Sequence, residues 1–150
     1  MTVDLPKLAI AVRQPWAHVI VQGWKDIENR SWPTRYRGPV CIHASKFDKR
    51  IFAEDLEGYQ ETIYLGIEVP TFDFDDLTFG AIIGVVDIVD CVTRSPSPWF
   101  FGDYGFVLAN ARSINPIPVK GMQGFFDWRS RVIDPNMIPS ASTATRGLLL

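Results

Sequence analysis

The pattern of apolar and polar residues in the first third of the chain predicts three short strands and one helix. The apolar run within residues 7–12 is typical of a short buried strand. A helix is expected next, with Pro15 near its first position and Gly23 just past its end. Residues 26–32 alternate as a strand does, and residues 38–45 are a further candidate strand.

A second helix is expected to begin at Ser45, because Asp48 three residues later completes a capping-box pattern. Its apolar residues repeat at helical spacing, at Phe52, Leu56, Tyr59 and Ile63. The helix would carry most of the acidic residues of this region on its outer face. The irregular, acidic residues 66–78 that follow are expected to form a loop.

Residues 80–93 predict a long strand that is apolar on both faces. Such a strand needs cover on its outer side, so we expect a barrel strand that packs beneath a helix. Gly84 in its middle would supply a bend.

The rest of the chain predicts shorter elements. A loop at 95–103 is followed by a strand at 104–111, an extended segment at 116–120 and a turn or helix at 125–128. Residues 129–150 lose the pattern and are expected to form a loose tail. Since no repeat or linker interrupts the chain, residues 1–150 are expected to be a single domain with a core at about 7–128. The elements indicate an α+β fold with a mostly antiparallel sheet.

The charge of the chain is distributed unevenly, although its net value is only −2. Residues 13–50 hold eight Lys or Arg against three acids, residues 51–93 hold ten acids and no Lys or Arg, and residues 94–150 hold six Lys or Arg against three acids. A polyanion can meet a positive face on such a protein. A solvated acidic helix on an ordinary surface explains the same numbers, and charge alone favours this second interpretation.

The two cysteines, Cys41 and Cys91, are too few for a disulfide scaffold, which indicates a reducing, intracellular compartment. The first residues lack both the basic and the apolar region of a signal peptide. The longest apolar runs, such as residues 81–86, are too short to cross a bilayer. We therefore expect a cytoplasmic protein with no membrane partner.

The most informative segment is Gly23-Trp-Lys-Asp-Ile-Glu-Asn-Arg30, which fits the pattern Gly-x-Lys-x-x-Glu-x-Arg at all four fixed positions. In this pattern the chain resembles the ASCH domain family, and so it does in the flanking segments 14–17, 36–39, 42–46 and 118–124. The resemblance covers about residues 7–128. It implies a small PUA-like barrel of mixed or antiparallel strands, flanked by a few α-helices, with a cleft beside the first helix. Such domains are associated with RNA, with transcriptional coactivators and, in some branches, with hydrolysis.

The resemblance places Lys25, Glu28 and Arg30 in that cleft. On a strand, Glu28 and Arg30 point to the same side, and Lys25 lies at the turn before it. Lys and Arg suit phosphate contacts, and a carboxylate accepts hydrogen bonds from a base edge. A salt-bridge network that only closes the mouth of the barrel is the alternative for these three residues.

Neighbouring residues are further candidates for the cleft. Trp16 would offer a stacking plane for an unpaired base, although its helical spacing favours a core position. His43, Ser45 and Lys46 lie in one of the flanking segments and are candidate ligand-binding residues. Because a lone histidine among apolar neighbours is more often structural, a lining role for His43 is favoured over a catalytic one.

Two enzymatic alternatives compete with binding. One branch of the family resembles an amidohydrolase of an acetylated cytidine, which has a Thr where this chain has Glu28, so the absence of a hydroxyl at 28 argues against that mechanism. A carboxylate between two cations stays ionised, which favours accepting hydrogen bonds over proton transfer. RNA cleavage would use Lys25 with a hydroxyl group from Tyr36, Tyr104 or Ser45.

Other chemistries find no support in the motifs. Cys41 and His43 share a strand face, but no second pair has metal-ligand spacing, so no metal is expected. Walker loops, nucleophile elbows and dinucleotide fingerprints are absent, and no cofactor is expected. The sequence therefore predicts a nucleic-acid-binding module, for single-stranded RNA above all. The alternatives are a small hydrolase of RNA or of a modified, nucleoside-like molecule, and an adaptor whose acidic second helix docks a protein partner.

Overall fold

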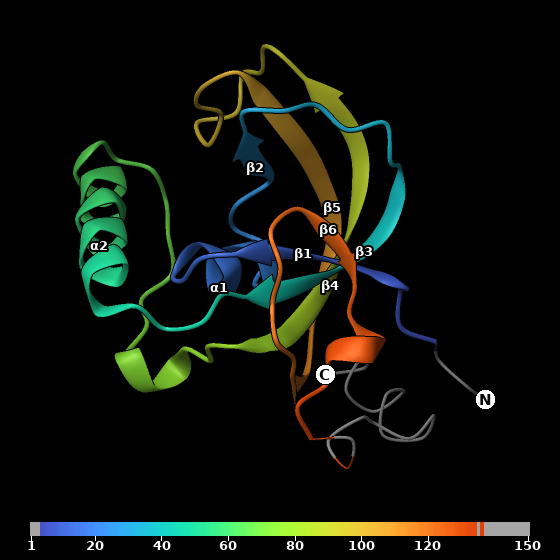
Figure 1. Cartoon of the computed structure of the whole chain (residues 1–150). Coiled ribbons are helices and arrows are strands. Elements are labelled where there is room, and N and C mark those ends of the chain that lie inside the picture. The colour runs from blue at the N-terminus through green and yellow to red at the C-terminus, as the bar shows by residue number, and fades with distance from the viewer. Residues whose placement is uncertain (1–3, 135, 137–150) are drawn as a thin grey trace.

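In the computed structural model, which describes residues 4–134 and 136, one six-stranded sheet curls into a half-barrel (Figure 1). Its strands are β1 (Leu8–Val12), β2 (Ile27–Arg30), β3 (Gly38–Ala44), β4 (Ala81–Val92), β5 (Tyr104–Pro118) and β6 (Phe125–Asp127). Their order is β2-β5-β4-β3-β1-β6, and within this sheet β1 and β3 form the one parallel pair. With two α-helices beside the sheet, the predicted α+β, barrel-like fold is confirmed.

The first helix, α1 (Trp16–Val21), packs against the middle of the sheet. Its inward residues are Ala17, Val19, Ile20 and Val21. At Gly84 in β4 the two elements approach so closely that a Cβ would lie 2.5 Å from Val21 Cγ1 and 2.6 Å from the Arg112 carbonyl oxygen. Helix α1 therefore covers part of this strand, and glycine is required at 84 because a side chain would not fit beneath the helix. The expected helix over the outer face is not seen, because α1 packs in the cluster that contains Trp32 and Phe125, and the other face of β4 packs without α1 or α2.

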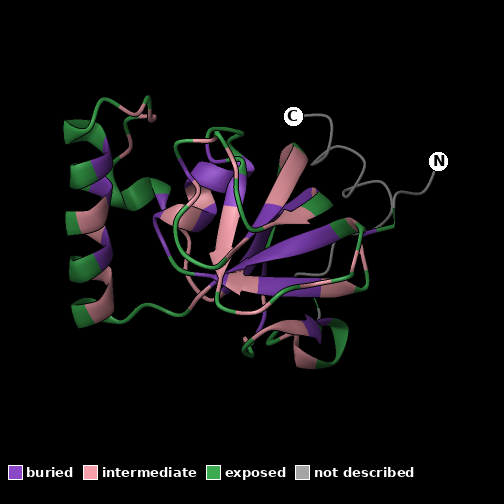
Figure 2. Ribbon diagram, turned by 90° about the horizontal axis from the view of Figure 1, so that it is seen from above, coloured by how far each residue is buried: buried purple, intermediate pink, exposed green. Residues whose placement is uncertain are grey.

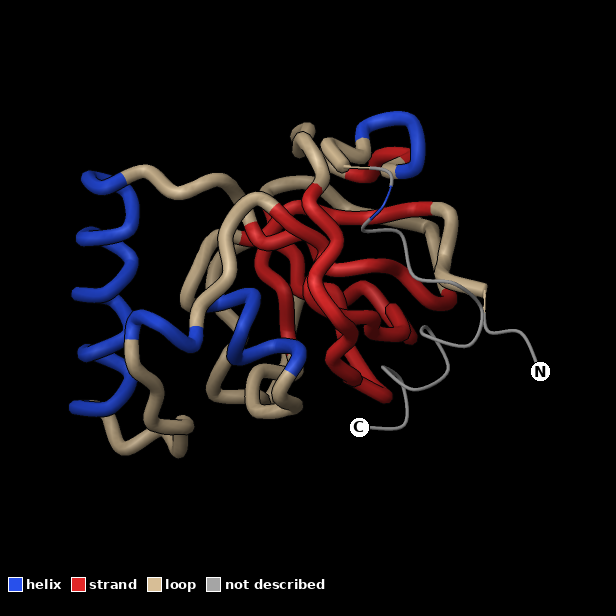
Figure 3. Tube along the Cα trace, turned by 90° about the horizontal axis from the view of Figure 1, so that it is seen from below, coloured by secondary structure: helices blue, strands red, loops and turns tan. Residues whose placement is uncertain are grey.

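The second helix, α2 (Lys49–Tyr64), stands beside the barrel, and α1 lies between it and the sheet (Figure 2 and Figure 3). It begins later than predicted, because Asp48 is its N-cap. The Asp48 Oδ1 atom accepts hydrogen bonds from the backbone N–H groups of Arg50 and Ile51, both at 3.0 Å. The prediction that Ser45 begins the helix is therefore wrong, and Ser45 directly follows β3 instead.

The inner face of α2 also differs from the predicted apolar stripe. Tyr59 is buried as expected, but Ile63 is 53% exposed. Asp55 and Thr62 are buried instead. Asp55 turns inward because it pairs with Arg13, whereas the three glutamates of the helix are exposed. Figure 2 shows that the exposed residues of α2 form its side away from the barrel.

Two predictions for the second half of the chain need correction. The strand expected at 104–111 and the extended segment at 116–120 belong to one strand, β5, which stays paired with β4 through several register shifts. Residues 125–128, expected to be a turn or helix, contain β6, which pairs with β1. Phe125 and Phe126 pack into two different core clusters, as neighbouring residues of a strand do.

The first residues of the expected tail have regular structure. Arg129–Arg131 forms a 3-10 turn, and Val132 pairs with Val119 in an isolated bridge. Residues 135 and 137–150 lie outside the described residues, so the tail stays a prediction there.

Aromatic side chains fill the space between β2 and β6, the two edges of the sheet. Trp32, just after β2, packs against Phe125 of β6 with ring centroids 5.8 Å apart, and against Phe106 at 5.4 Å. Arg30 Nη2 donates to the backbone carbonyl of Ala11 at 2.5 Å, which ties β2 to β1. Side-chain contacts therefore complete the barrel where strand pairing stops, and Trp32, Arg30 and Ala11 also line the candidate site.

Candidate functional site

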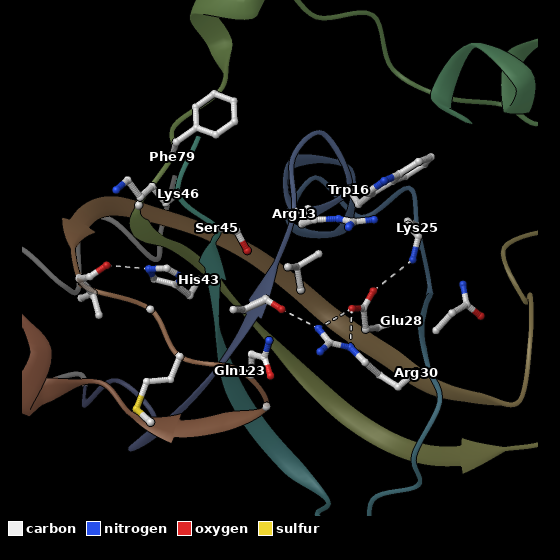
Figure 4. A pocket seen from close by; sticks show the side chains of 18 of the residues that line it. Arg13, Trp16, Lys25, Glu28, Arg30, His43, Ser45, Lys46, Phe79 and Gln123 are labelled. Atoms are coloured by element: carbon white, nitrogen blue, oxygen red, sulfur yellow. Dashed lines mark hydrogen bonds and ion pairs between the residues drawn. The ribbon is translucent and has the colours of Figure 1, made fainter. Parts of the chain in front are cut away.

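A pocket of about 1390 Å³ lies between the start of α1, strand β2, the end of β3 and residues 118–124 (Figure 4). Drug-sized ligands occupy pockets of about 300–1,000 Å³, so this one has room for a nucleotide. Its lining mixes aromatic rings with charged side chains. The Gly-x-Lys-x-x-Glu-x-Arg segment contributes all three of its charged motif residues to this lining.

Glu28 lies between Lys25 and Arg30 in a compact polar cluster (Figure 4). Arg30 Nε donates to Glu28 Oε2 at 2.9 Å, and Arg30 Nη2 lies 2.7 Å from the same oxygen. Lys25 Nζ lies 3.5 Å from Glu28 Oε1 and donates to the backbone carbonyl of Ile27. Glu28 and Arg30 are two residues apart on β2, which turns both side chains to one side, as expected from the period of a strand.

The two cations of this cluster are engaged inside the protein. Lys25 is only 7% exposed, and its burial lowers its pKa, an effect that the neighbouring Glu28 carboxylate opposes. Arg30 is bound to Glu28 and to the Ala11 carbonyl. Part of the network expected to close the barrel is therefore present, because Arg30 ties β2 to β1. Glu28 Oε1, whose one ion-pair contact among the described residues is the longer one to Lys25, keeps room to accept a hydrogen bond from a ligand.

Asp55 of α2 holds two side chains of the pocket wall. Arg13 Nη2 donates to Asp55 Oδ1 at 3.0 Å, and Arg13 Nε lies 3.0 Å from Oδ2. Trp16 Nε1 donates to Oδ1 at 3.2 Å. The Trp16 ring also packs against Tyr59 and Trp99, with centroids 5.8 and 6.4 Å away. Trp16 thus belongs both to the packed interior and to the pocket lining.

His43, Ser45 and Lys46 line the pocket together at the end of β3 (Figure 4). His43 is 1% exposed, and its Nε2 donates to the Val119 carbonyl at 2.7 Å. Burial lowers the pKa of His43, which keeps the ring neutral at neutral pH. Gly121 lies against this ring, since a Cβ there would be 2.6 Å from His43 Cε1. His43 therefore acts as a packed support of the pocket.

The structure does not bring every predicted hydroxyl group to the pocket. Ser45 is among the lining residues, whereas Tyr36 and Tyr104 are not. The Tyr36 hydroxyl donates to the Pro39 carbonyl at 2.6 Å, so it is engaged locally. Tyr104 begins β5, where it pairs with Arg30 in the β2–β5 ladder. Of the three candidates, Ser45 alone lines this pocket.

Sequence reasoning missed several lining residues, namely Arg13, Phe79, Lys120, Met122 and Gln123. Segment 118–124 contains three of them, and its place in the family resemblance was the signal that could have found them. Arg13 and Phe79 carried no such signal, because they reach the pocket through the packing of α1 and α2.

The charge of the pocket is opposite to that of the chain. Five cationic side chains and one carboxylate line it, a formal net charge of +4: Arg13, Lys25, Arg30, Lys46 and Lys120, with Glu28. The whole chain carries −2. Positive charge is therefore gathered at the pocket, whereas the exposed glutamates of α2 are not among its lining residues.

Comparison with known proteins decides the family. The family model of the ASCH domain matches residues 10–118, which include the 23–30 motif. The chain belongs to the ASCH domain family. Two curated relatives of this ASCH domain, both named activating signal cointegrator 1 and found in Homo sapiens and Mus musculus, are each 30% identical to it over 125 residues. The similarity covers 75% of this chain but 20% of each relative, so the chain spans about a fifth of their length.

Two features are absent from residues 4–134 and 136 of this ASCH domain. No group of three or more His, Cys, Asp or Glu side chains is placed to hold a metal ion. Neither helix in that part of the chain has the length and apolar character that a membrane-spanning helix needs.

Proposed function

We propose that this ASCH domain binds single-stranded nucleic acid, RNA in the first place, in the pocket beside α1. The observation that carries the proposal is the net charge of +4 around a pocket with aromatic walls, on a chain with a net charge of −2. A cleft lined by one sign of charge concentrates an oppositely charged ligand. The family as a whole is typically associated with nucleic acid, which supports the same class of ligand.

The lining suits an unpaired base better than a duplex. The rings of Trp16 and Trp32 lie at the wall, and flat rings stack on splayed-out bases with little sequence preference. Glu28 Oε1 can accept a hydrogen bond from an exocyclic amino group, a contact that carboxylates make with cytosine. Lys25 and Arg30 hold Glu28 in place for that contact. In a duplex these base edges are paired and out of reach of a pocket.

The test is fluorescence anisotropy with short single-stranded RNA and DNA at low and moderate salt, comparing wild type with Lys25→Met. This substitution keeps the length of the buried stem but removes one of the two cations that hold Glu28. We expect binding that weakens with salt and that the variant weakens further, by about tenfold, the size of a lost charge-assisted contact.

Lys49→Met is the matched control, because Lys49 is exposed on α2, lies outside the pocket lining and changes the net charge equally. Circular dichroism shows whether each variant is folded. If folded wild type and folded Lys25→Met bind with equal affinity, the motif does not take part in binding. An affinity that changes neither with salt nor with Lys25→Met would point instead to a protein partner at the acidic face of α2.

One observation favours a second function, hydrolysis of RNA or of a modified nucleoside. Burial lowers the pKa of Lys25, which increases the fraction of its amine that is unprotonated and free to accept a proton, and Ser45 lines the same pocket. Turnover of acylated nucleosides or labelled RNA by wild type, lost in Lys25→Met, would establish this activity. Binding without turnover would leave the domain a binding module.

A further inference from the structure

Two lysines of the pocket form no ion pair with the described residues. These are Lys46 and Lys120, and both are exposed. The other three cations of the lining are each held by a carboxylate. An anionic group that enters the pocket therefore meets its free positive partners at these two lysines.

Strand pairing brings the two lysines to the same end of three neighbouring strands, β3, β4 and β5. Ala44 ends β3 and pairs with Ala81, the first residue of β4, which in turn pairs with Pro118 at the end of β5. Lys46 and Lys120 each follow two residues after these ends. Because β3 and β5 flank β4 at about 4.8 Å each, their ends lie about 10 Å apart. Two long lysine side chains can meet an anion across that distance.

Hydrogen bonds hold the segments that carry the lysines. Val119 N–H donates to the Gly80 carbonyl at 3.1 Å, which extends the β4–β5 pairing past the end of the strand. Arg131 Nε donates to the Lys120 carbonyl at 2.7 Å, and Arg131 Nη2 donates to the Gly121 carbonyl at 3.1 Å. A site whose backbone is already held loses less entropy when it binds.

Glu28, the carboxylate of the pocket lining, lies away from the strand ends that carry the two lysines. Figure 4 shows Glu28 beside Lys25 and Arg30 on one side, and Lys46 on the other. A phosphate is repelled by Glu28 and attracted by the free lysines, whereas the amino group of a base is a donor that Glu28 Oε1 can accept. The two ends of the pocket therefore favour opposite ends of a nucleotide.

We infer that the pocket binds a nucleotide unit in one orientation, with its phosphate between Lys46 and Lys120 and the amino edge of its base at Glu28. This inference rests on the proposed function and adds the direction in which the ligand lies. It also moves the phosphate contact from the motif cations, where the sequence placed it, to two lysines outside the motif.

The experiment is isothermal titration calorimetry at low salt with cytidine 5′-monophosphate, cytidine and inorganic phosphate, each against wild type and Lys46→Ala/Lys120→Ala. We expect wild type to bind the nucleotide about tenfold more tightly than the nucleoside, the sum of two partly exposed charge contacts. In the double variant this ratio falls to about one to threefold, while the affinity for cytidine stays unchanged. Inorganic phosphate should bind far more weakly, because it lacks the base.

Lys7→Ala/Arg94→Ala is the matched control. Both residues are exposed, lie outside the pocket lining, and change the net charge by the same two units. An equal loss of nucleotide affinity in this control would show a general charge effect and overturn the placement of the phosphate. Inorganic phosphate binding as tightly as the nucleotide would overturn the nucleotide as ligand.

The failures of the two proposals can be told apart. If wild type binds cytidine and its monophosphate equally well, and the double variant changes nothing, the phosphate position is wrong but the pocket still binds a nucleoside. If wild type binds neither of them and no single-stranded RNA, the proposed function fails, and the orientation fails with it.

Discussion

Single buried side chains decide how the pocket is built, and His43 is the clearest case. Its ring is nearly inaccessible, its Nε2 is bound to the Val119 carbonyl, and Gly121 leaves no space beside it. The sequence indicated a histidine on a strand among apolar neighbours and favoured a lining role. It gave no sign of the contact with Val119, which is far away in the chain and is brought close only by the neighbouring strand ends.

The burial of His43 predicts a dependence of stability on pH. Its pKa is lowered by burial, with the charge of Arg131 acting in the same direction and the bond to Val119 opposing. The unfolded chain, with the ordinary value of 6.5, therefore takes up a proton first as the pH falls. The stability that the neutral ring contributes is present above pH 6.5 and is lost as the pH falls below it.

Urea unfolding at pH 7, 6 and 5 measures this effect. His43→Gln keeps a donor for the Val119 carbonyl but does not titrate, so its stability is expected to fall less than that of wild type between pH 7 and 5. His18→Gln is the comparison, because the half-buried His18 is the other histidine of the chain and its pKa is lowered too. Parallel curves for wild type and His43→Gln would contradict the account.

At the scale of elements, α2 depends on one buried carboxylate for its place beside the barrel. Asp55 reaches inward to Arg13 and Trp16, and Tyr59 packs on the Trp16 ring. We expect Asp55→Asn to destabilise the domain by about 1–2 kcal/mol, a value below that of a fully buried pair because Arg13 is largely exposed. Faster hydrogen exchange of the α2 amides should accompany the loss.

Glu54→Gln is the control for this prediction. Glu54 lies on the same helix, but its pair with Arg50 is exposed and 3.9 Å long, so its loss should change the unfolding free energy by less than about 0.5 kcal/mol. If the two variants are equally stable, Asp55 does not anchor the helix.

The elements show where local pattern is sufficient and where it is not. Residues 80–93 were correctly predicted as a long strand, and the first six residues of β4 are buried on both faces as the apolar run requires, whereas Val89 near its end is 50% exposed. The start of α2 was misplaced because Ser45 and Asp48 both fit an N-cap, and the choice depends on where β3 ends. The inward turn of Asp55 could not be predicted, since its partner Arg13 is 42 positions away in the chain.

At the scale of the whole molecule, the fold brings cationic side chains together at the pocket, although the chain as a whole is acidic. The chain-wide value of −2 gave no reason to expect a positive site, yet the pocket lining carries +4. The motif predicted the cluster of Lys25, Glu28 and Arg30. Lys46 was a candidate from its flanking segment, whereas Lys120 was not; both line the pocket because β3 and β5 flank β4, a neighbourhood that a linear pattern does not reveal.

The most direct test of the central claim is a titration of the ¹⁵N-labelled domain with a short single-stranded RNA, followed by backbone amide NMR shifts. The account predicts salt-sensitive shifts that cluster at residues 25–30, 43–46 and 119–124, the three segments that meet at the pocket. Shifts confined to the outer face of α2, or no shifts at any RNA concentration, would contradict it.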